Sequence, residues 1–213
     1  MKTKGDFLSN AMVYKHKRNI TTLLKSNILL IIISAVLLLG MMIGSFSVNI
    51  CEDNNYYGIS DYFKSYILFL NENDFFGVFL NSIFMFVLLI FINYILGLCV
   101  IGNFISIFIF FIFSFGVGSV SGFLYKIYSL NGVCFFSLII LPGLFLFTIN
   151  YILSLKQSFC FSRELFKLVK SENSVSVNFK SYSIKFLIHF ILSLIICLIN
   201  TFFSYTFCGM FEF

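Results

Sequence analysis

The sequence predicts an all-α integral membrane protein with about five transmembrane helices. The chain of 213 residues is 60% hydrophobic and 11% charged, and its mean hydropathy is +1.00. A soluble domain carries about 25% charged residues, so this chain has too few charges to cover a surface that faces water. We therefore expect a single polytopic membrane domain over residues 1–213, with membrane lipid around most of it.

Five apolar stretches are long enough to cross a bilayer, which takes about 20 residues as a helix. None of them contains Lys, Arg, Asp or Glu. The predicted spans are residues 27–48, 78–101, 104–125, 132–155 and 186–210. The first apolar run is too long for a signal peptide, and no small-x-small cleavage site follows it, so we expect a retained signal anchor.

The basic residues predict the orientation, because Lys and Arg concentrate on the cytoplasmic side of a membrane. Twelve of the 14 lie before the first span or in the loop 156–185: Lys2, Lys4, Lys15, Lys17, Arg18 and Lys25, then Lys156, Arg163, Lys167, Lys170, Lys180 and Lys185. Four predicted spans separate the two groups, so both lie on one side. We expect the N-terminus inside and the C-terminus outside a bacterial cell membrane. The acidic loop 49–77 is then external.

Two connecting stretches predict short interfacial amphipathic helices, which lie in the headgroup plane with their apolar face toward lipid. In the external loop, YGISDYFKSYILFLNENDFF carries apolar residues at helical spacing: Ile59, Tyr62, Phe63, Tyr66, Ile67 and Leu70. In the cytoplasmic loop, FSRELFKLVK carries one apolar stripe: Phe161, Leu165, Leu168 and Val169. The outer helix is either a docking platform for a partner or a seal at the bundle edge, and both interpretations stay open.

No pattern in the sequence indicates catalysis. There is no HExxH motif, no cysteine pair with zinc-ligand spacing beside a histidine, and no GxSxG or GK[ST] motif. Glu52 and Asp53 are paired carboxylates, but their loop is too short to build a carbohydrate cleft. We therefore predict that the protein is not an enzyme and has no cofactor, metal ion or nucleic-acid partner.

His189 is the one histidine within a predicted span. An ionisable residue inside a membrane is by default a candidate for function, here proton relay or ligand binding. At its predicted depth the imidazole can instead reach the interface or form a hydrogen bond to a neighbouring helix. Packing is the favoured interpretation.

The segment FGVGSVSG, residues 115–122, interrupts a run of Phe, Ile and Leu with small residues. Small residues let membrane helices approach closely, which apolar surface alone does not achieve in lipid. One helical face carries four of them, and the first span repeats the spacing with two glycines: Ser114, Gly118, Ser121 and Gly122, then Gly40 and Gly44. We predict a close helix contact, either within the chain or with a partner, so a homo-oligomer stays open.

Pro142 removes one helix donor and clashes with the carbonyl of Leu138, which predicts a kink in the fourth span. Four asparagines are expected to form interhelical hydrogen bonds: Asn81, Asn93, Asn150 and Asn200. The six cysteines show no paired spacing, and cysteine is more often a small buried hydrophobe. A disulfide between two of the outer cysteines stays open: Cys51, Cys134 and Cys208.

The order of these features resembles the stage II sporulation protein M family. A basic N-terminus, a span ending in GMMIGSFSVN and an acidic loop precede LGLCVIGNF, FSFGVGSVSGF and an LP pair. The resemblance covers about residues 15–170, and its most specific positions are Leu96-Gly97, Ile101-Gly102, Gly118, Gly122 and Leu141-Pro142. The chain departs from the family after Gly102, where Asn103-Phe104 replace a proline that would fix the start of a helix.

The resemblance implies a non-enzymatic membrane scaffold that takes part in sporulation engulfment. Such a scaffold recruits two partners with wall-cleaving activity, stage II sporulation proteins D and P, to the septal or engulfing membrane for peptidoglycan remodelling. Gly97 and Gly102 then join the helix-packing or partner-interface positions, and residues 49–77 are expected contacts. The competing hypothesis is a small permease or the membrane subunit of a transporter, supported by His189 and the asparagines. A holin-like pore former fits the external acids and the kinked span poorly.

Overall fold

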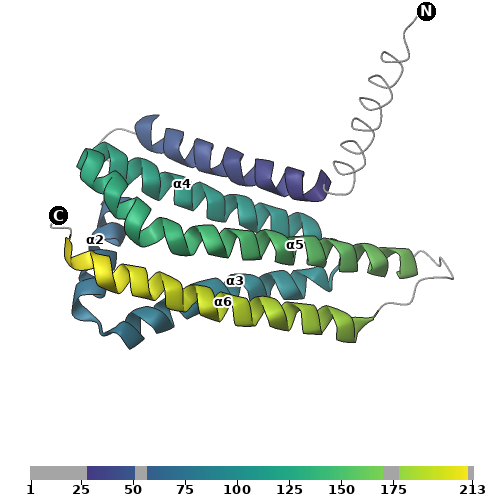
Figure 1. The fold of residues 1–213 in the computed structure, drawn as a ribbon. Coiled ribbons are helices and arrows are strands. Elements are labelled where there is room, and N and C mark those ends of the chain that lie inside the picture. Colours follow the sequence, from purple (N-terminus) through teal and green to yellow (C-terminus); the bar gives the residue numbers. More distant parts are fainter. Residues whose placement is uncertain (1–27, 51–56, 170–177, 211–213) are drawn as a thin grey trace, which may run out of the picture.

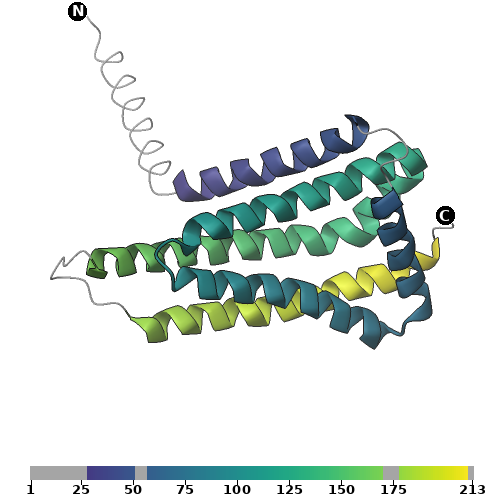
Figure 2. The ribbon, with the colours of Figure 1, turned by 180° about the vertical axis from the view of Figure 1, so that it is seen from behind.

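The computed structural model describes residues 28–50, 57–169 and 178–210, which Figures 1 and 2 show from opposite sides. Over these ranges the chain is helical and contains no strand. Among these residues, four helices are long and apolar enough to cross a membrane: Ile28–Ile50, Phe75–Gly97, Gly102–Val169 and Phe179–Met210. The prediction of an all-α protein with several membrane-length helices is confirmed.

The helix Gly102–Val169 doubles back on itself at Ser129. It consists of α4 (Gly102–Phe135), a π-helical turn (Phe136–Ile140) and α5 (Leu141–Val169). Ser129 has φ 49° and ψ −124°, a backbone conformation outside the helical region. The two arms on either side of it run side by side in opposite directions (Figures 1 and 2).

The amphipathic helix predicted after the first span is confirmed as α2 (Tyr57–Glu72). It lies across one end of the bundle, the end at which α4 reverses (Figure 2); we call this the α2 end. The ring of Phe63 makes edge-to-face contacts with Phe123 and Phe135, with centroids 6.1 and 5.4 Å apart. Phe63 and Leu70 are both buried, so two successive turns of α2 are anchored on the bundle.

The chain turns sharply between α3 (Phe75–Gly97) and α4. The predicted limit of the second span, residue 101, is wrong, because residues 98–101 form a turn in which the Cys99 N–H donates to the Leu96 carbonyl at 3.1 Å. A Cβ on Gly102 would collide with that same carbonyl. Glycine at this position therefore permits the close approach of the two helix ends.

The predicted interfacial helix over FSRELFKLVK is also wrong, because α5 continues unbroken to Val169. No glycine or proline interrupts residues 144–169. In addition, Ser162 Oγ donates to the carbonyls of Cys99 at 3.0 Å and Val100 at 3.2 Å. These bonds tie the last turns of α5 to the turn between α3 and α4, so this segment belongs to the bundle.

The last helix, α6 (Phe179–Phe207), begins before the predicted residue 186 and ends in a 3-10 turn, Cys208–Met210. Its start is set by an N-cap, because the side chain of Asn178 accepts a hydrogen bond from the Ser181 N–H at 3.0 Å. The predicted start, residue 186, lies where the charged residues end. The cap instead adds two turns that carry Lys180 and Lys185.

The π-helical turn Phe136–Ile140 lies directly before Pro142. A proline ring crowds the carbonyl four residues earlier, here that of Leu138, and a π-helical turn changes the local hydrogen-bond pattern where this crowding occurs. The next residue, Gly143, packs on α6, since a Cβ there would lie 2.6 Å from the Cβ of Asn200. The irregular turn therefore lies next to a close approach of α5 to α6.

The aromatic core lies between α3, α4, α5 and α6. Phe86 stacks on Phe147 with ring centroids 4.3 Å apart, and Phe110 stacks on Tyr151 at 5.2 Å. The last three of these rings are completely buried. In lipid such contacts act through shape, since apolar surface by itself does not drive helices together.

Several predicted features lie outside the described residues: the N-terminal basic residues, Cys51 and the pair Glu52-Asp53. Of the outer cysteines that the structure describes, Cys134 is exposed. Cys208 is buried beside Leu70 and Val78.

Candidate functional site

The predicted small-residue stripe of α4 lies against the first helix of the same chain. A Cβ at Gly118 would lie 2.7 Å from a Cα of the first helix, and one at Gly122 would lie 3.1 Å from another. The contact is mutual, because a Cβ at Gly40 would lie 2.7 Å from the Cβ of Ser114. A Cβ at Gly44 would collide with the backbone of α4. The two helices therefore meet backbone to backbone along four glycines.

Serines next to this contact take different roles. Ser119, which is not on the predicted stripe, shares its hydroxyl proton between the Phe115 carbonyl of its own helix at 3.0 Å and the Gly44 carbonyl across the contact at 3.3 Å. Ser114 and Ser121 donate to carbonyls of their own helix at 2.8 and 2.9 Å. Such internal bonds satisfy a hydroxyl inside a membrane helix without linking it to a neighbour.

Gly97 is a second close-approach position, at the end of the bundle opposite α2. A Cβ there would lie 2.5 Å from Ser158 Oγ and 3.1 Å from Cζ of Tyr182. The Tyr182 hydroxyl donates to the Tyr94 carbonyl at 2.9 Å, and the two rings stack with centroids 5.3 Å apart. Gly97 therefore makes space on α3 for a tyrosine of α6.

His189 is buried and paired with Asn150 of α5. The Asn150 amide donates to the His189 carbonyl at 3.1 Å, which sets the orientation of the amide. Its Oδ1 then accepts a hydrogen bond from Nδ1 of His189 at 2.6 Å, so the proton of the neutral imidazole is on Nδ1. The structure thus gives this histidine a defined partner and a defined tautomer.

A ladder of serines on α5 was not predicted from the sequence. Ser154, Ser158 and Ser162 follow Asn150 at intervals of four residues, so all four lie on one face of the helix. The Asn93 amide of α3 donates to Ser154 Oγ at 2.8 Å, and Ser158 Oγ lies 3.4 Å from the Asn93 carbonyl. The interval of four residues between these polar side chains is visible in the sequence and could have indicated the ladder. The ladder joins α5 to α3 by hydrogen bonds.

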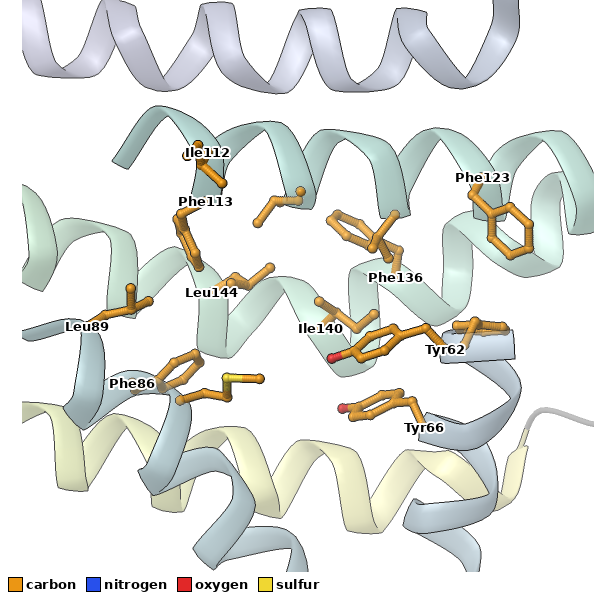
Figure 3. A pocket seen from close by; sticks show the side chains of 15 residues that line it. Tyr62, Tyr66, Phe86, Leu89, Ile112, Phe113, Phe123, Phe136, Ile140 and Leu144 are labelled. Atoms are coloured by element: carbon orange, nitrogen blue, oxygen red, sulfur yellow. The ribbon is translucent and has the colours of Figure 1, made fainter. Parts of the chain in front are cut away.

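An apolar groove of about 410 Å³ opens between α2, α3 and α4 (Figure 3). Phe86 of α3 lies on one side of it and Phe113 of α4 on the other (Figure 3). Its rim includes Tyr62, Met85 and Ile112, which are 62%, 49% and 53% exposed. The groove therefore opens sideways, onto the surface that faces lipid in a membrane.

Beneath α2 the groove adjoins a more polar space of about 370 Å³. Tyr62 and Tyr66 line both, and their hydroxyls point into the groove (Figure 3). The polar space also contains Asn81, and the amide of Asn200 donates to Ser82 Oγ there at 3.3 Å. Burial raises the pKa of Tyr66 to about 12, so this phenol is neutral at physiological pH and can donate a hydrogen bond.

Gly116 is a glycine of α4 that the first helix does not cover. It lines the groove, it is exposed, and a Cβ there would meet no atom within 4 Å. Gly118 and Gly122, by contrast, are buried. α4 therefore has two faces with glycine, one filled by the first helix and one open to the groove. Of these two faces, the filled one alone was predicted from the sequence.

This arrangement suits binding of an apolar, elongated group with a polar end. In the part of the chain that the structure describes, no three His, Cys, Asp or Glu side chains are placed to hold a metal ion. No protein-family model, no curated protein and no solved structure matches the chain.

Proposed function

We propose that this protein is a non-enzymatic membrane scaffold whose groove receives a transmembrane helix of a partner protein. Gly116 carries the proposal, because it is exposed in an apolar groove with open space in front of it. Lipid tails adapt to any apolar surface, whereas two helices approach closely where side chains are small. An uncovered glycine face therefore favours a helix as the occupant.

The polar space beneath α2 fits the end of such a helix. The last carbonyls and the first N–H groups of a helix lack partners within it, and they are costly to leave unsatisfied in an apolar environment. Tyr62 and Tyr66 offer hydroxyls, and Asn81 offers an amide, at the level where the partner's helix would end. The groove and the adjoining polar space thus offer an apolar wall and polar groups for the end of a membrane helix.

The proposal includes five membrane crossings, because the two arms of Gly102–Val169, before and after Ser129, are counted separately. The N-terminus is then inside, and α2 lies on the external face of a bacterial cell membrane. The charges of the described helices support this orientation. The acidic residues Asp61, Glu72 and Asp74 lie in or next to α2. The opposite end carries Lys156, Arg163, Lys167, Lys180 and Lys185.

The class of partner follows from the family resemblance. Stage II sporulation proteins D and P are wall-cleaving partners in that family, so we propose peptidoglycan-degrading proteins with a membrane anchor. Such an anchor in the groove would hold the partner's catalytic part on the external side, beside α2. The scaffold would then act at the septal or engulfing membrane during sporulation.

The test is affinity capture of the tagged protein from mildly solubilised membranes of sporulating cells. Gly116→Leu fills the groove. Gly209→Leu is the matched control, because a Cβ at Gly209 also meets no atom within 4 Å and this residue does not line the groove. We expect the parent and Gly209→Leu to retain peptidoglycan-degrading proteins, identified by mass spectrometry, and Gly116→Leu to lose them at equal abundance.

Photo-crosslinking adds a direct readout of the contact. A crosslinking residue at Met85, on the groove rim, should capture the partner's membrane anchor. A crosslinking residue at the adjacent position Phe84, which is 65% exposed and does not line the groove, should not capture this anchor. Equal capture at both positions contradicts the groove. If an ATP-hydrolysing subunit is captured and no wall hydrolase is, the scaffold hypothesis is rejected and the transporter hypothesis is supported.

A further inference from the structure

A separate cleft of about 560 Å³ lies between α5 and α6, at the end of the bundle opposite α2. Lys156 and Gln157 of α5 and Ser181 and Lys185 of α6 line it, together with the buried His189. It shares no lining residue with the groove beneath α2. We call this space the basic cleft.

The charge of the basic cleft is positive. Lys156 and Lys185 both line it, and neither forms an ion pair with any residue that the structure describes. Glu164 is the carboxylate on its lining, and this side chain is exposed at the edge. Two ammonium groups against one carboxylate favour an anionic occupant, and lysine is a common ligand for phosphate.

The hydrogen-bonding groups of the basic cleft define the occupant further. His189 Nδ1 is committed to Asn150, and the Tyr182 hydroxyl is committed to the Tyr94 carbonyl. Gln157 differs, because its Oε1 is buried and accepts no hydrogen bond within the described chain. A buried acceptor without a partner is costly, so this oxygen favours an occupant that also brings a donor, such as a hydroxyl.

The walls of the cleft include apolar surface beside these polar groups. Leu153 and Phe161 of α5 line it, and Leu153 is 42% exposed. An acyl chain can lie along this surface while its headgroup is between the lysines. A soluble anion would leave the same surface uncovered.

We infer that the basic cleft binds an anionic phospholipid with a hydroxylated headgroup, as in phosphatidylglycerol. Lys156 and Lys185 contact the phosphate, Gln157 accepts a hydrogen bond from a headgroup hydroxyl, and Leu153 contacts the acyl chain. Basic pockets between membrane helices are known to bind such headgroups on the cytoplasmic side. The inference does not depend on the scaffold proposal, since it rests on a different end of the molecule.

The test is native mass spectrometry of the purified full chain, released from bilayers of phosphatidylcholine with or without phosphatidylglycerol. We expect the parent to retain phosphatidylglycerol and not phosphatidylcholine. Lys156→Gln/Lys185→Gln should weaken retention roughly 30-fold, from the attraction that each basic residue contributes near anionic lipid. Lys167→Gln/Lys180→Gln is the matched control, because it removes equal charge from the same two helices outside the cleft lining, and it should retain the lipid.

Two further variants separate the site from a loss of structure. Lys156→Arg/Lys185→Arg keeps both charges and should keep the lipid. Gln157→Leu should reduce the preference for phosphatidylglycerol over phosphatidic acid, which has no headgroup alcohol. The inference is overturned if Lys167→Gln/Lys180→Gln loses as much phosphatidylglycerol as Lys156→Gln/Lys185→Gln. It is also overturned if Lys156→Gln/Lys185→Gln retains this lipid like the parent, or if inorganic phosphate alone displaces the lipid.

Discussion

At the scale of one residue, Ser129 is the position at which the longest helix reverses. Its φ of 49° and ψ of −124° are close to the first central position of a type II′ turn, where glycine is favoured. An L-residue with positive φ pays a steric cost of about 1 kcal/mol or more. The reversal is therefore held by packing around Ser129 and not by the preference of the serine itself.

Replacing Ser129 with glycine should stabilise the protein. We expect Ser129→Gly to raise the free energy of unfolding by roughly 0.5–1 kcal/mol, because glycine adopts positive φ without steric cost. The measurement is thermal unfolding in detergent. Ser65→Gly, in the middle of α2, is the control and should destabilise by a similar amount. A lower unfolding temperature for Ser129→Gly would contradict the backbone conformation.

The Asn150–His189 pair makes a second prediction for single residues. Asn150→Leu or His189→Leu leaves the other partner buried without its hydrogen bond, so each should cost about 1–3 kcal/mol. The double variant Asn150→Leu/His189→Leu should be less destabilised than the sum, because both polar groups are removed together. Thermal unfolding of the four proteins gives this double-mutant cycle. Strict additivity would show that the pair is not coupled.

At the scale of helices, the two glycine faces of α4 separate internal packing from partner binding. Gly118 is closed by the first helix, whereas Gly116 faces open space. Both glycines lie within one turn of each other, so sequence spacing alone does not distinguish their roles. What distinguishes them is the position of the first helix, which only the three-dimensional arrangement shows.

The two faces should respond differently to the same substitution. Gly118→Leu forces a side chain into the backbone of the first helix and should destabilise by about 1–3 kcal/mol or more, as overpacking does. Gly116→Leu should leave the unfolding temperature nearly unchanged, because space is available for the side chain. Equal destabilisation by the two variants, measured by thermal unfolding, would contradict the packing of α4 described above.

At the scale of the whole molecule, exposed cysteines at the two ends test the proposed orientation. Cys134 lies near the α2 end, and Cys99 lies in the turn at the opposite end. In intact cells that contain single-cysteine variants of the protein, a membrane-impermeant thiol reagent should label Cys134 directly. It should label Cys99 only after the membrane is permeabilised. The reverse pattern would place α2 inside and remove the external face that the scaffold proposal requires.

The class of this protein and the nature of most of its helices are readable from the amino-acid sequence. Apolar composition and long runs without charge require lipid and helices, because backbone groups in a bilayer must be satisfied within the segment. The apolar stripe of α2 was likewise readable, since its period is local. Local spacing also revealed the small residues of the first helix and α4, although not their partner.

The ends of several helices and the pairing of their faces depend instead on contacts between distant parts of the chain. The last turns of α5 are held because Ser162 finds acceptors in the turn after α3, which is distant in the sequence. Gly116 and the basic cleft were not predicted, since a cavity is defined by the absence of neighbours and no local pattern encodes that. In lipid, helices are brought together by shape and a few hydrogen bonds, and these depend on residues that are far apart along the chain.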